Sequence, residues 1–476
     1  MSSLPGKRLS APLFLFTLCA GAFSHAPALA QFQALPSAPP PSLLLAQSST
    51  PAPAPASVPA QNRLTRAQAE QLAIRHNPHI SVSQLLALAQ HQVVRETRSA
   101  ELPTLNGGIT AQQAKEGGRL SSFGISTTLL LTHAGAGVNL SQLITDFGRT
   151  TNLVAAAKLR EEAARSNAQA TLEDIVLATD QAFYAALEAQ SVLQVAQQTV
   201  NTRQATQGQV SQLTRNKLRS TLDLSFAEVN LSQAQLLVLD ARNNADAALA
   251  ALNEVLGVAT SLDTGSNSPV TYTLVDDSAQ PAAPPVDINA LTAAALRQRP
   301  DLQAAGLEQQ SALKYSQAEH DLRRPTISAL GTVGGTPVRD GRYYPSSWDG
   351  AIGLNLNVPL FNGFLNSSLA KEADLRAQSA GEQQRALRDQ VVRDVRTAWL
   401  DATSSYQKEA VTAQLQQQAD ASLQLATSRY RLGLSSIVEL SQAQLAQTQA
   451  AITNTNAQYQ YRLSLAALNY QIGVRP

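Results

Sequence analysis

The sequence of 476 residues has few of the residues that build disulfide-bonded domains, aromatic cores or strongly charged surfaces. It contains one cysteine, Cys19, so an intrachain disulfide is excluded. Its formal net charge of +1 gives no electrostatic case for binding nucleic acid. Aromatic residues make up only 5% of the chain, and stretches rich in Ala, Gln and Leu replace them. This composition favours long, closely packed helices over a sheet-rich globule.

Catalytic and metal-binding motifs are also missing. We find no phosphate-binding loop, nucleophile elbow or HExxH motif. His76, His79 and His91 lie close together in the sequence, but Pro78 interrupts the helical spacing that a zinc site would need. The sequence therefore predicts no enzyme, no cofactor and no metal site.

Long hydrophobic runs are confined to the N-terminus. Lys7 and Arg8 precede an apolar run, and residues 28–30 form a small-x-small site. This pattern predicts a secretory signal peptide over residues 1–30, which also carries Cys19. After it, no apolar run reaches the about 18 residues of a transmembrane helix. Residues 31–62 are rich in Pro, Ala and Ser, and we expect a disordered lead-in there.

The rest of the chain contains an internal duplication. Pro78 and Pro300 lie 222 positions apart, as do Pro103 and Pro325, and further along the matching positions lie 216 apart. The six-residue change falls between the presumed strands of each copy, where a loop can absorb it. We predict a first repeat over 63–257, a linker over 258–286 and a second repeat over 287–476.

Each repeat has the same predicted order of elements. A short helix and a second helix precede two strands around a Gly/Ser-rich loop, and a very long helix and a return helix follow. The long helices are expected over 148–216 and 366–432, and neither contains an internal proline. A helix of about 70 residues rises roughly 100 Å. A compact globule does not need that length, whereas a coiled coil that crosses the periplasm does.

The predicted strands alternate between apolar and polar residues. In the second repeat the apolar positions are Ile352, Leu354, Leu356, Val358 and Leu360. Weaker alternation occurs at Val138, Leu140 and Ile144, at Ile327, Ala329 and Val333, and at Leu105, Ile109 and Ala111. Runs of about 9 to 11 residues match membrane β-strands with an apolar face toward lipid, although half-buried strands of a soluble sheet share the pattern. Because four strands cannot close a barrel in lipid, the chain must oligomerise if it spans; a dimer gives eight strands and a trimer twelve.

With this duplicated order of helices and strands, the chain resembles the outer-membrane efflux protein family, the TolC-like channels. The resemblance covers roughly 63–473 and is carried by motifs that recur in duplicate. They are Leu64-Thr65 through Asn77-Pro78, Leu143-Ile144-Thr145-Asp146-Phe147-Gly148-Arg149, Pro359-Leu360-Phe361-Asn362-Gly363, and Arg429-Tyr430-Arg431-Leu432-Gly433-Leu434-Ser435-Ser436-Ile437. The second and third motifs mark the strand-to-helix junctions, with Asp146, Phe147 and Gly148 in one repeat and Asn362 and Gly363 in the other.

The resemblance implies a mainly α fold with a small β part. Three chains would share a twelve-stranded transmembrane β-barrel, above a long α-helical coiled-coil barrel that closes at its periplasmic tip. It also implies a homotrimer in contact with outer-membrane lipid. The implied partners are a periplasmic adaptor (membrane fusion) protein and an inner-membrane transporter of the RND or ABC type.

The tip turns carry the candidate gate. Gly433 fits a turn at positive φ, and its counterpart at the 216 offset is Lys217. Beyond the turns, Glu439 matches Asp223, and in the family acids at such positions line the closed aperture. A ring of carboxylates in a narrow opening favours cations. The alternative is that both are solvated acids at helix starts, favoured by the helix dipole.

The resemblance also places a closing latch near these turns. Tyr430 matches one latch position, whereas Ser435 stands where an arginine can occur. Arg219, at the first-repeat position equivalent to Ser435, is our candidate for the missing cation.

We therefore predict an outer-membrane channel, the exit duct of a tripartite efflux system for drugs or other small molecules. The outer-membrane component of a type I protein or peptide secretion system is the alternative within the family. A periplasmic coiled-coil scaffold or adaptor without a barrel is the alternative of another class.

Overall fold

The computed structural model describes residues 63–112, 119–122, 126–129, 133–258, 272–276, 281–335 and 348–474. The predicted signal peptide over 1–30 and the lead-in over 31–62 lie outside the described residues, as does much of the predicted linker. Ala60–Pro476 form one compact unit.

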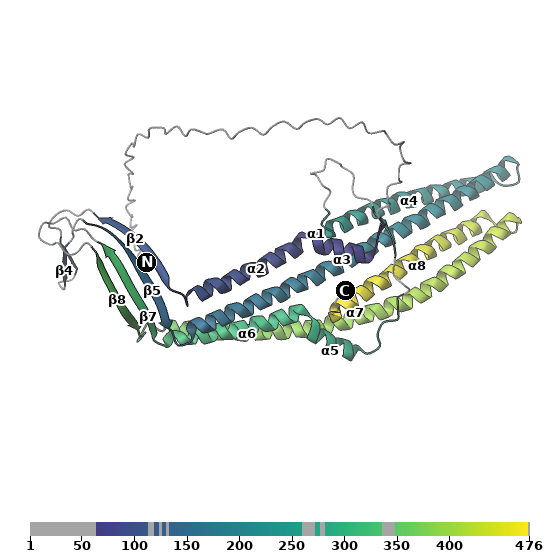
Figure 1. Ribbon diagram of the computed structural model, residues 1–476. Helices are drawn as coiled ribbons and strands as arrows, with labels where there is room; N and C mark the ends of the chain where they lie inside the picture. Colours follow the sequence, from purple (N-terminus) through teal and green to yellow (C-terminus); the bar gives the residue numbers. More distant parts are fainter. Residues whose placement is uncertain are drawn as a thin grey trace, which may run out of the picture. The chain divides into compact units, whose positions relative to one another are not determined.

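The helices recur in the same order in the two halves of this unit. The first half contains α1 (Arg66–His76), α2 (Pro78–Ser99), α3 (Arg149–Arg215) and α4 (Thr221–Val255), and the second contains α5 (Ile288–Gln298), α6 (Pro300–His320), α7 (Leu365–Arg431) and α8 (Ile437–Ile472). The long helices α3 and α7 have 67 residues each, as the sequence predicts to within a residue or two at each end. In Figure 1 the hairpins α3–α4 and α7–α8 both turn at the end farthest from the sheet. The repeat boundaries themselves stay a prediction.

Short-range signals fix where the first helices start. The Thr65 side chain and Gln68 form a capping box at the start of α1. Pro78 and Pro300 occupy the first turn of α2 and α6, where a missing N–H costs nothing. Asn77 ends one helix and starts the next, because its N–H donates to the Ala73 carbonyl at 2.8 Å and its Oδ1 accepts from the His79 N–H at 2.9 Å.

The helices form a layer next to the sheet and two hairpins farther from it. In the part nearer the sheet, α2 contacts α3, α3 contacts α6, and α6 contacts α7. In the part nearer the hairpin turns, α3 pairs with α4, α7 pairs with α8, and α8 lies against α3. Phe183, with only 1% of its surface exposed, lies in a core that α1, α3 and α4 share. Trp399 lies in a second core beside α5 and donates to the Pro285 carbonyl at 2.7 Å.

Four strands form one antiparallel sheet in the order β2-β5-β7-β8. They are β2 (Thr104–Gln112), β5 (His133–Thr145), β7 (Thr326–Gly335) and β8 (Asp349–Asn357). The register of β5 against β7 shifts between Leu143 and Thr145, so Ile144 lies in an irregularity that ends the predicted alternation.

One strand prediction is wrong at its end. The strand containing Ile352, Leu354 and Leu356 stops at Asn357, so Val358 and Leu360 lie beyond the sheet. Pro359 explains the early end, since proline has no N–H to donate to a ladder.

The sequence pattern also missed short strands. The expected Gly/Ser-rich loop contains a hairpin of β3 (Arg119–Ser122) and β4 (Ser126–Leu129). Near the N-terminal end of the unit, β1 (Arg63–Leu64) pairs in parallel with β6 (Thr273–Leu274). A 3₁₀ turn (Asp321–Arg323) follows α6. Within the described ranges, no helix has both the length and the apolar character needed to cross a membrane.

Candidate functional site

The four-stranded sheet separates apolar from polar side chains by its register. Residues paired across antiparallel strands share a face. Leu105 pairs with Leu140, Leu140 with Gly331, and Gly331 with Ile352. This face is mainly apolar, with Leu105, Ile109, Val138, Leu140, Ile327, Ala329, Val333, Ile352, Leu354 and Leu356, and it also carries Gln142. The other face is mainly polar, with Thr104, Asn106, Asn139, Ser141, Ser328, Thr332, Asn355 and Asn357, and it also carries Leu143 and Leu330.

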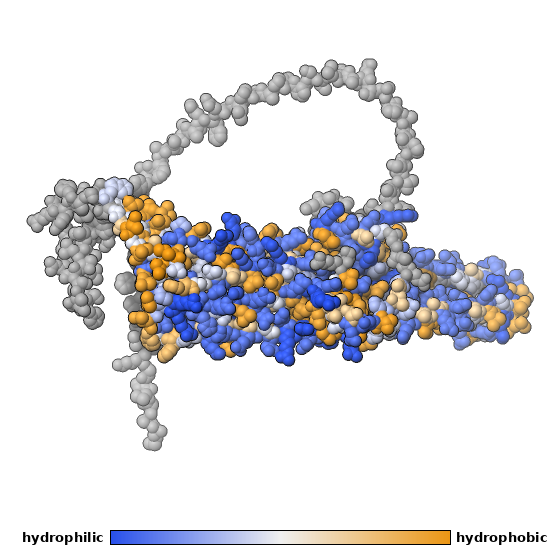
Figure 2. Space-filling view, turned by 60° about the horizontal axis from the view of Figure 1, so that its bottom comes forward, coloured by the Kyte–Doolittle hydropathy of each residue, from blue (hydrophilic) through white to orange (hydrophobic). Residues whose placement is uncertain are grey.

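The apolar face is uncovered in the single chain. Ile352 is 94% exposed, Ile109 85% and Leu354 76%. Figure 2 shows hydrophobic colour gathered at the sheet end, whereas hydrophilic residues dominate the surface of the helical part. Exposed apolar surface of this kind marks an interaction with lipid or protein.

The sheet and the helical layer next to it have corresponding edges: β2 and α2 lie at one edge, and β8 and α7 lie at the other. β2 follows α2 and β8 precedes α7, while β5 leads into α3 and β7 follows α6. The strand order β2-β5-β7-β8 therefore matches the helix order α2-α3-α6-α7. Within the described residues, β2 and β8 each have one strand partner in this sheet and so leave one ladder edge free.

The strand-to-helix junctions use two successive left-handed residues in each half. Phe147 and Gly148 have φ of 56° and 111°, and Gly363 and Phe364 have φ of 64° and 67°. The order of Gly and Phe is thus exchanged between the halves. Phe364 is a junction residue that the motif reading missed, although it lies 216 positions after Gly148.

Asp146 holds the first junction. Its carboxylate accepts from the Thr150 N–H at 2.7 Å and from the Gly148 N–H at 3.2 Å. Acceptors at a helix start satisfy N–H groups that have no partner within the helix. In the second half the Asn362 carbonyl accepts from the Leu365 N–H at 3.3 Å.

Both hairpin tips have the same backbone. Lys217 has φ of 56° and Gly433 has φ of 75°. The Leu218 N–H donates to the Leu213 carbonyl at 2.9 Å, and the Leu434 N–H donates to the Arg429 carbonyl at 2.8 Å. These bonds are those of a Schellman motif, which ends a helix with one left-handed residue.

Arg219 connects the two hairpins. Its terminal N–H donates to the Tyr430 carbonyl at 2.9 Å, and its guanidinium carbon lies 4.5 Å from the Tyr430 ring centre. Tyr430 is 2% exposed within a tip core that includes Val210, Ala227 and Ile437. Burial raises the pKa of Tyr430 above its usual value, so its hydroxyl stays neutral near pH 7. Among the described residues, the hydroxyls of Tyr430 and Ser435 are buried without a hydrogen-bond partner.

The two candidate gate acids differ in their partners. The Glu439 carboxylate lies 3.1 Å from the Arg429 Nε, and the Glu439 N–H donates to the capping Ser436 hydroxyl at 3.3 Å. Asp223 lies in the first turn of α4, partly buried, and forms no ion pair within the described chain. Asp223 therefore carries the less compensated charge.

A buried acid pair near α1 was missed by the sequence reading. Arg66 Nη1 lies 3.0 Å from Glu70 Oε1 and 3.1 Å from Asp180 Oδ2. Burial, followed by the hydrogen bond and charge of Asp180, raises the pKa of Glu70 to about 7. Burial also raises the pKa of Asp180.

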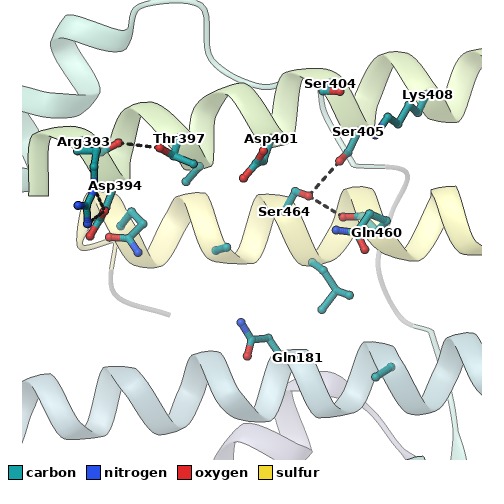
Figure 3. Close-up of a pocket in the computed structure, with 15 residues that line it drawn as sticks. Gln181, Arg393, Asp394, Thr397, Asp401, Ser404, Ser405, Lys408, Gln460 and Ser464 are labelled. Carbon is teal, nitrogen blue, oxygen red and sulfur yellow. Dashed lines mark hydrogen bonds and ion pairs between the residues drawn. The ribbon is translucent and has the colours of Figure 1, made fainter. Parts of the chain in front are cut away.

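A cavity of about 840 Å³ lies between α3 and the α7–α8 hairpin. Figure 3 shows Gln181 facing it from one side and Asp401 from the other, with the Ser405 and Ser464 hydroxyls 3.1 Å apart across the hairpin. The residues that line this cavity include both acidic and basic side chains, Arg393, Asp394, Asp401 and Lys408, and they form no nucleophile–base pair. In the described part of the chain, no three His, Cys, Asp or Glu side chains are placed to hold a metal ion.

Comparison with known proteins identifies the family. The sequence model for outer membrane efflux proteins matches residues 61–258 and 291–474. The outer membrane protein TolC of Salmonella enteritidis is 25% identical over 420 residues, which cover 85% of this chain and 81% of that protein.

Solved structures share the fold. CusC has a TM-score of 0.73 at 18% identity, covering 86% of this chain and 92% of its own. VceC from Vibrio cholerae has a TM-score of 0.71 at 18% identity, covering 86% and 96%. The chain belongs to the outer membrane efflux protein family, and it is therefore an outer-membrane protein of a channel family and not of an enzyme family.

Proposed function

We propose that three copies of the chain form a closed channel that serves as the exit duct of a tripartite efflux system. The observation that carries this proposal is the coincidence of free edges, with β2 and α2 on one side and β8 and α7 on the other. Copies placed side by side pair β8 of one with β2 of the next and bring α7 of one against α2 of the next. One interface then closes both layers.

Closure is required by the membrane. An unpaired strand edge in hydrocarbon leaves backbone groups without partners, each costing several kcal/mol. Two copies would supply eight strands and three would supply twelve, and the family resemblance favours three. In this arrangement the face with Ile352, Leu354 and Leu356 contacts lipid, and the face with Asn355 lines water.

Function as a duct, without chemistry of its own, follows from the same features. Long helical hairpins extend from the sheet to tips that an adaptor and an inner-membrane transporter of the RND or ABC type can engage. Small-molecule efflux is the proposed use, supported by the family description. The same duct would serve type I secretion, and the partner pump decides between the two. A periplasmic scaffold or adaptor is disfavoured because it would leave the apolar sheet face in water.

Asp223 and Glu439 form or flank the proposed periplasmic gate. Threefold symmetry would place three copies of each acid around the axis. Because Arg429 compensates Glu439, Asp223 is expected to dominate cation preference. In planar bilayers, Asp223→Asn should reduce cation-over-anion permeability more than Glu439→Gln. Unchanged conductance and selectivity in both variants would remove these acids from the gate.

The test of the proposed function is crosslinking in native membranes, then purification of the protein and mass spectrometry of its partners. Recovery of a proton-driven multidrug pump and its adaptor supports small-molecule efflux. An ATP-driven exporter with its adaptor moves the function to secretion. Recovery of a soluble periplasmic protein without either pump contradicts the channel.

A further inference from the structure

A second, smaller cavity lies closer to the hairpin turns, where α3 meets the α7–α8 hairpin. Its volume is about 350 Å³. Its lining residues are Val195, Gln198, Thr199, Thr202 and Arg203 of α3, Gln416, Asp420 and Leu423 of α7, and Gln444, Gln447, Thr448 and Ala451 of α8. Three helices from both halves therefore enclose it.

Arg203 is the buried cation of this cavity. It is 7% exposed, and its Nη1 donates to Gln444 Oε1, while Gln444 Nε2 donates to Thr206 Oγ1 at 3.1 Å. These bonds fix the guanidinium against α8. Within the described residues Arg203 has no carboxylate at ion-pair distance.

Arg299 is a buried arginine that does have a carboxylate partner. It is 8% exposed, and its Nη2 lies 2.6 Å from the Asp301 carboxylate. With that partner the pKa of Arg299 lies above its usual value despite burial. Burial without such a partner lowers the pKa of Arg203 to about 10. The charge of Arg203 is thus left uncompensated, which is costly for a buried group.

The remaining donors of Arg203 lie beside the cavity, because Arg203 lines it. A guanidinium has five N–H donors in a planar fork, and one nitrogen is used by Gln444. The other nitrogens have no hydrogen-bond partner in the described chain and are not sealed from solvent, since the cavity adjoins them. The amides of Gln198, Gln416 and Gln447 add further donors around the same space.

The remaining polar groups set limits on the ligand. The hydroxyls of Thr199, Thr202 and Thr448 donate to carbonyls one turn back and so offer only lone pairs to the cavity. Asp420 is exposed at the rim, where its Oδ1 accepts from Gln447 Nε2 at 3.0 Å. The guanidinium of Arg203 therefore supplies the charged hydrogen-bond donors of the cavity.

We propose that this cavity binds a small oxyanion, either a free inorganic ion or a carboxylate group, on the guanidinium of Arg203. A planar fork with free parallel N–H donors matches two oxygens of sulfate, phosphate or a carboxylate. The cavity is larger than one such ion, so water would share the space.

The bound anion would bridge the two hairpins above the gate. Arg203 lies 12 residues before the end of α3 at Arg215, a rise of roughly 18 Å. Gln416 and Gln447 belong to the other hairpin. The second-half counterpart of Arg203 is Ala419, so the site occurs once per chain and is not a product of the duplication.

The test is titration of the detergent-solubilised full chain with sulfate by calorimetry, at constant ionic strength kept with chloride. We expect saturable binding to the wild type, and at least about tenfold weaker binding for Arg203→Gln. Arg215→Gln is the matched control, because it removes the same charge from an exposed position of the same helix. Asp420→Asn should bind at least as tightly as wild type.

Further arms keep the result interpretable. Arg203→Lys keeps the charge but loses the fork, so intermediate affinity is expected, and circular dichroism verifies that each variant is folded. A parallel titration with acetate distinguishes the ligands: tighter sulfate identifies an inorganic oxyanion, and tighter acetate identifies a carboxylate. Absence of saturable binding to wild type, equal binding by folded Arg203→Gln, or weaker binding by Asp420→Asn would overturn the site.

Discussion

The two hairpin tips have one backbone and different side chains. At equivalent positions the first tip has Lys217 and Arg219, and the second has Gly433 and Ser435. Both tips end their long helix with the same pair of main-chain hydrogen bonds. The first tip, however, sends a charged side chain, Arg219, across to a main-chain carbonyl of the other hairpin, and its counterpart Ser435 has no hydrogen-bond partner among the described residues. Because main-chain bonds fix the turn, the side chains were free to diverge after duplication, and each half acquired its own contacts.

The same divergence occurs in the middle of the molecule. The first half buries Glu70 and Asp180 beside Arg66. The second half has Thr292 and Arg396 at the positions equivalent to the two acids. The first half therefore has a pH-sensitive contact that the second lacks.

The largest expected effect is on the pH dependence of stability, and it comes from Glu70→Gln, which removes the pH-sensitive acid of the first half. A raised pKa means that the folded state favours the protonated acid, so its stabilisation is complete below about pH 4.5 and is lost as the pH rises through about 7. The shift corresponds to at most about 3 kcal/mol, and partial solvent access reduces this to about 2 kcal/mol. Wild type should lose thermal stability between pH 5 and 8, and Glu70→Gln should abolish most of that loss. An unchanged pH profile would contradict the buried pair.

The next effect concerns the link between the hairpins. Arg219→Ala removes a hydrogen bond to the Tyr430 carbonyl and a cation–π contact, together about 1 to 2 kcal/mol. That change shifts a closed tip toward opening by roughly tenfold. Cells should become more sensitive to vancomycin, and single-channel conductance should rise. Ser435→Ala at the equivalent position is the control, since its hydroxyl has no partner in the described chain. Equal leakage in both variants would show that Arg219 is not a latch.

A smaller effect separates the two turns themselves. Gly433→Ala places a side chain at φ of 75° and should cost about 1 kcal/mol, because a Cβ there meets only Arg219 Nη2 at 3.9 Å and the cost is backbone strain alone. Lys217→Ala should cost almost nothing, since Lys217 already bears that strain. Amide hydrogen exchange of Leu434 and Leu218 measures the two turns separately. Equal acceleration in both variants would contradict strain as the cause.

These contacts show which features the sequence could predict. The long helices and the apolar face of the sheet were predictable, because proline-free apolar stripes and the alternation of residues along a strand depend only on local spacing. The C-terminal end of β8 and the β3–β4 hairpin were missed, since Pro359 overrides the alternation and the short strands, rich in Ser and Thr, have no apolar pattern. The Arg219–Tyr430 contact joins residues 211 positions apart. Only the resemblance directed attention to that pair, and nothing in the sequence paired Glu70 with Asp180.

The smallest expected effect tests whether the tip core is complete in a single chain. The Tyr430 hydroxyl is buried without a partner among the described residues, so Tyr430→Phe removes an unsatisfied group and keeps the ring under Arg219. Stability should change by less than about 0.5 kcal/mol, whereas Tyr430→Ala should cost about 3 kcal/mol or more by opening a cavity. Thermal unfolding of the purified oligomer compares the two. A loss above about 1 kcal/mol for Tyr430→Phe would mean that the hydroxyl is bonded in the assembly. The second hairpin would then be held from a neighbouring copy as well as by Arg219.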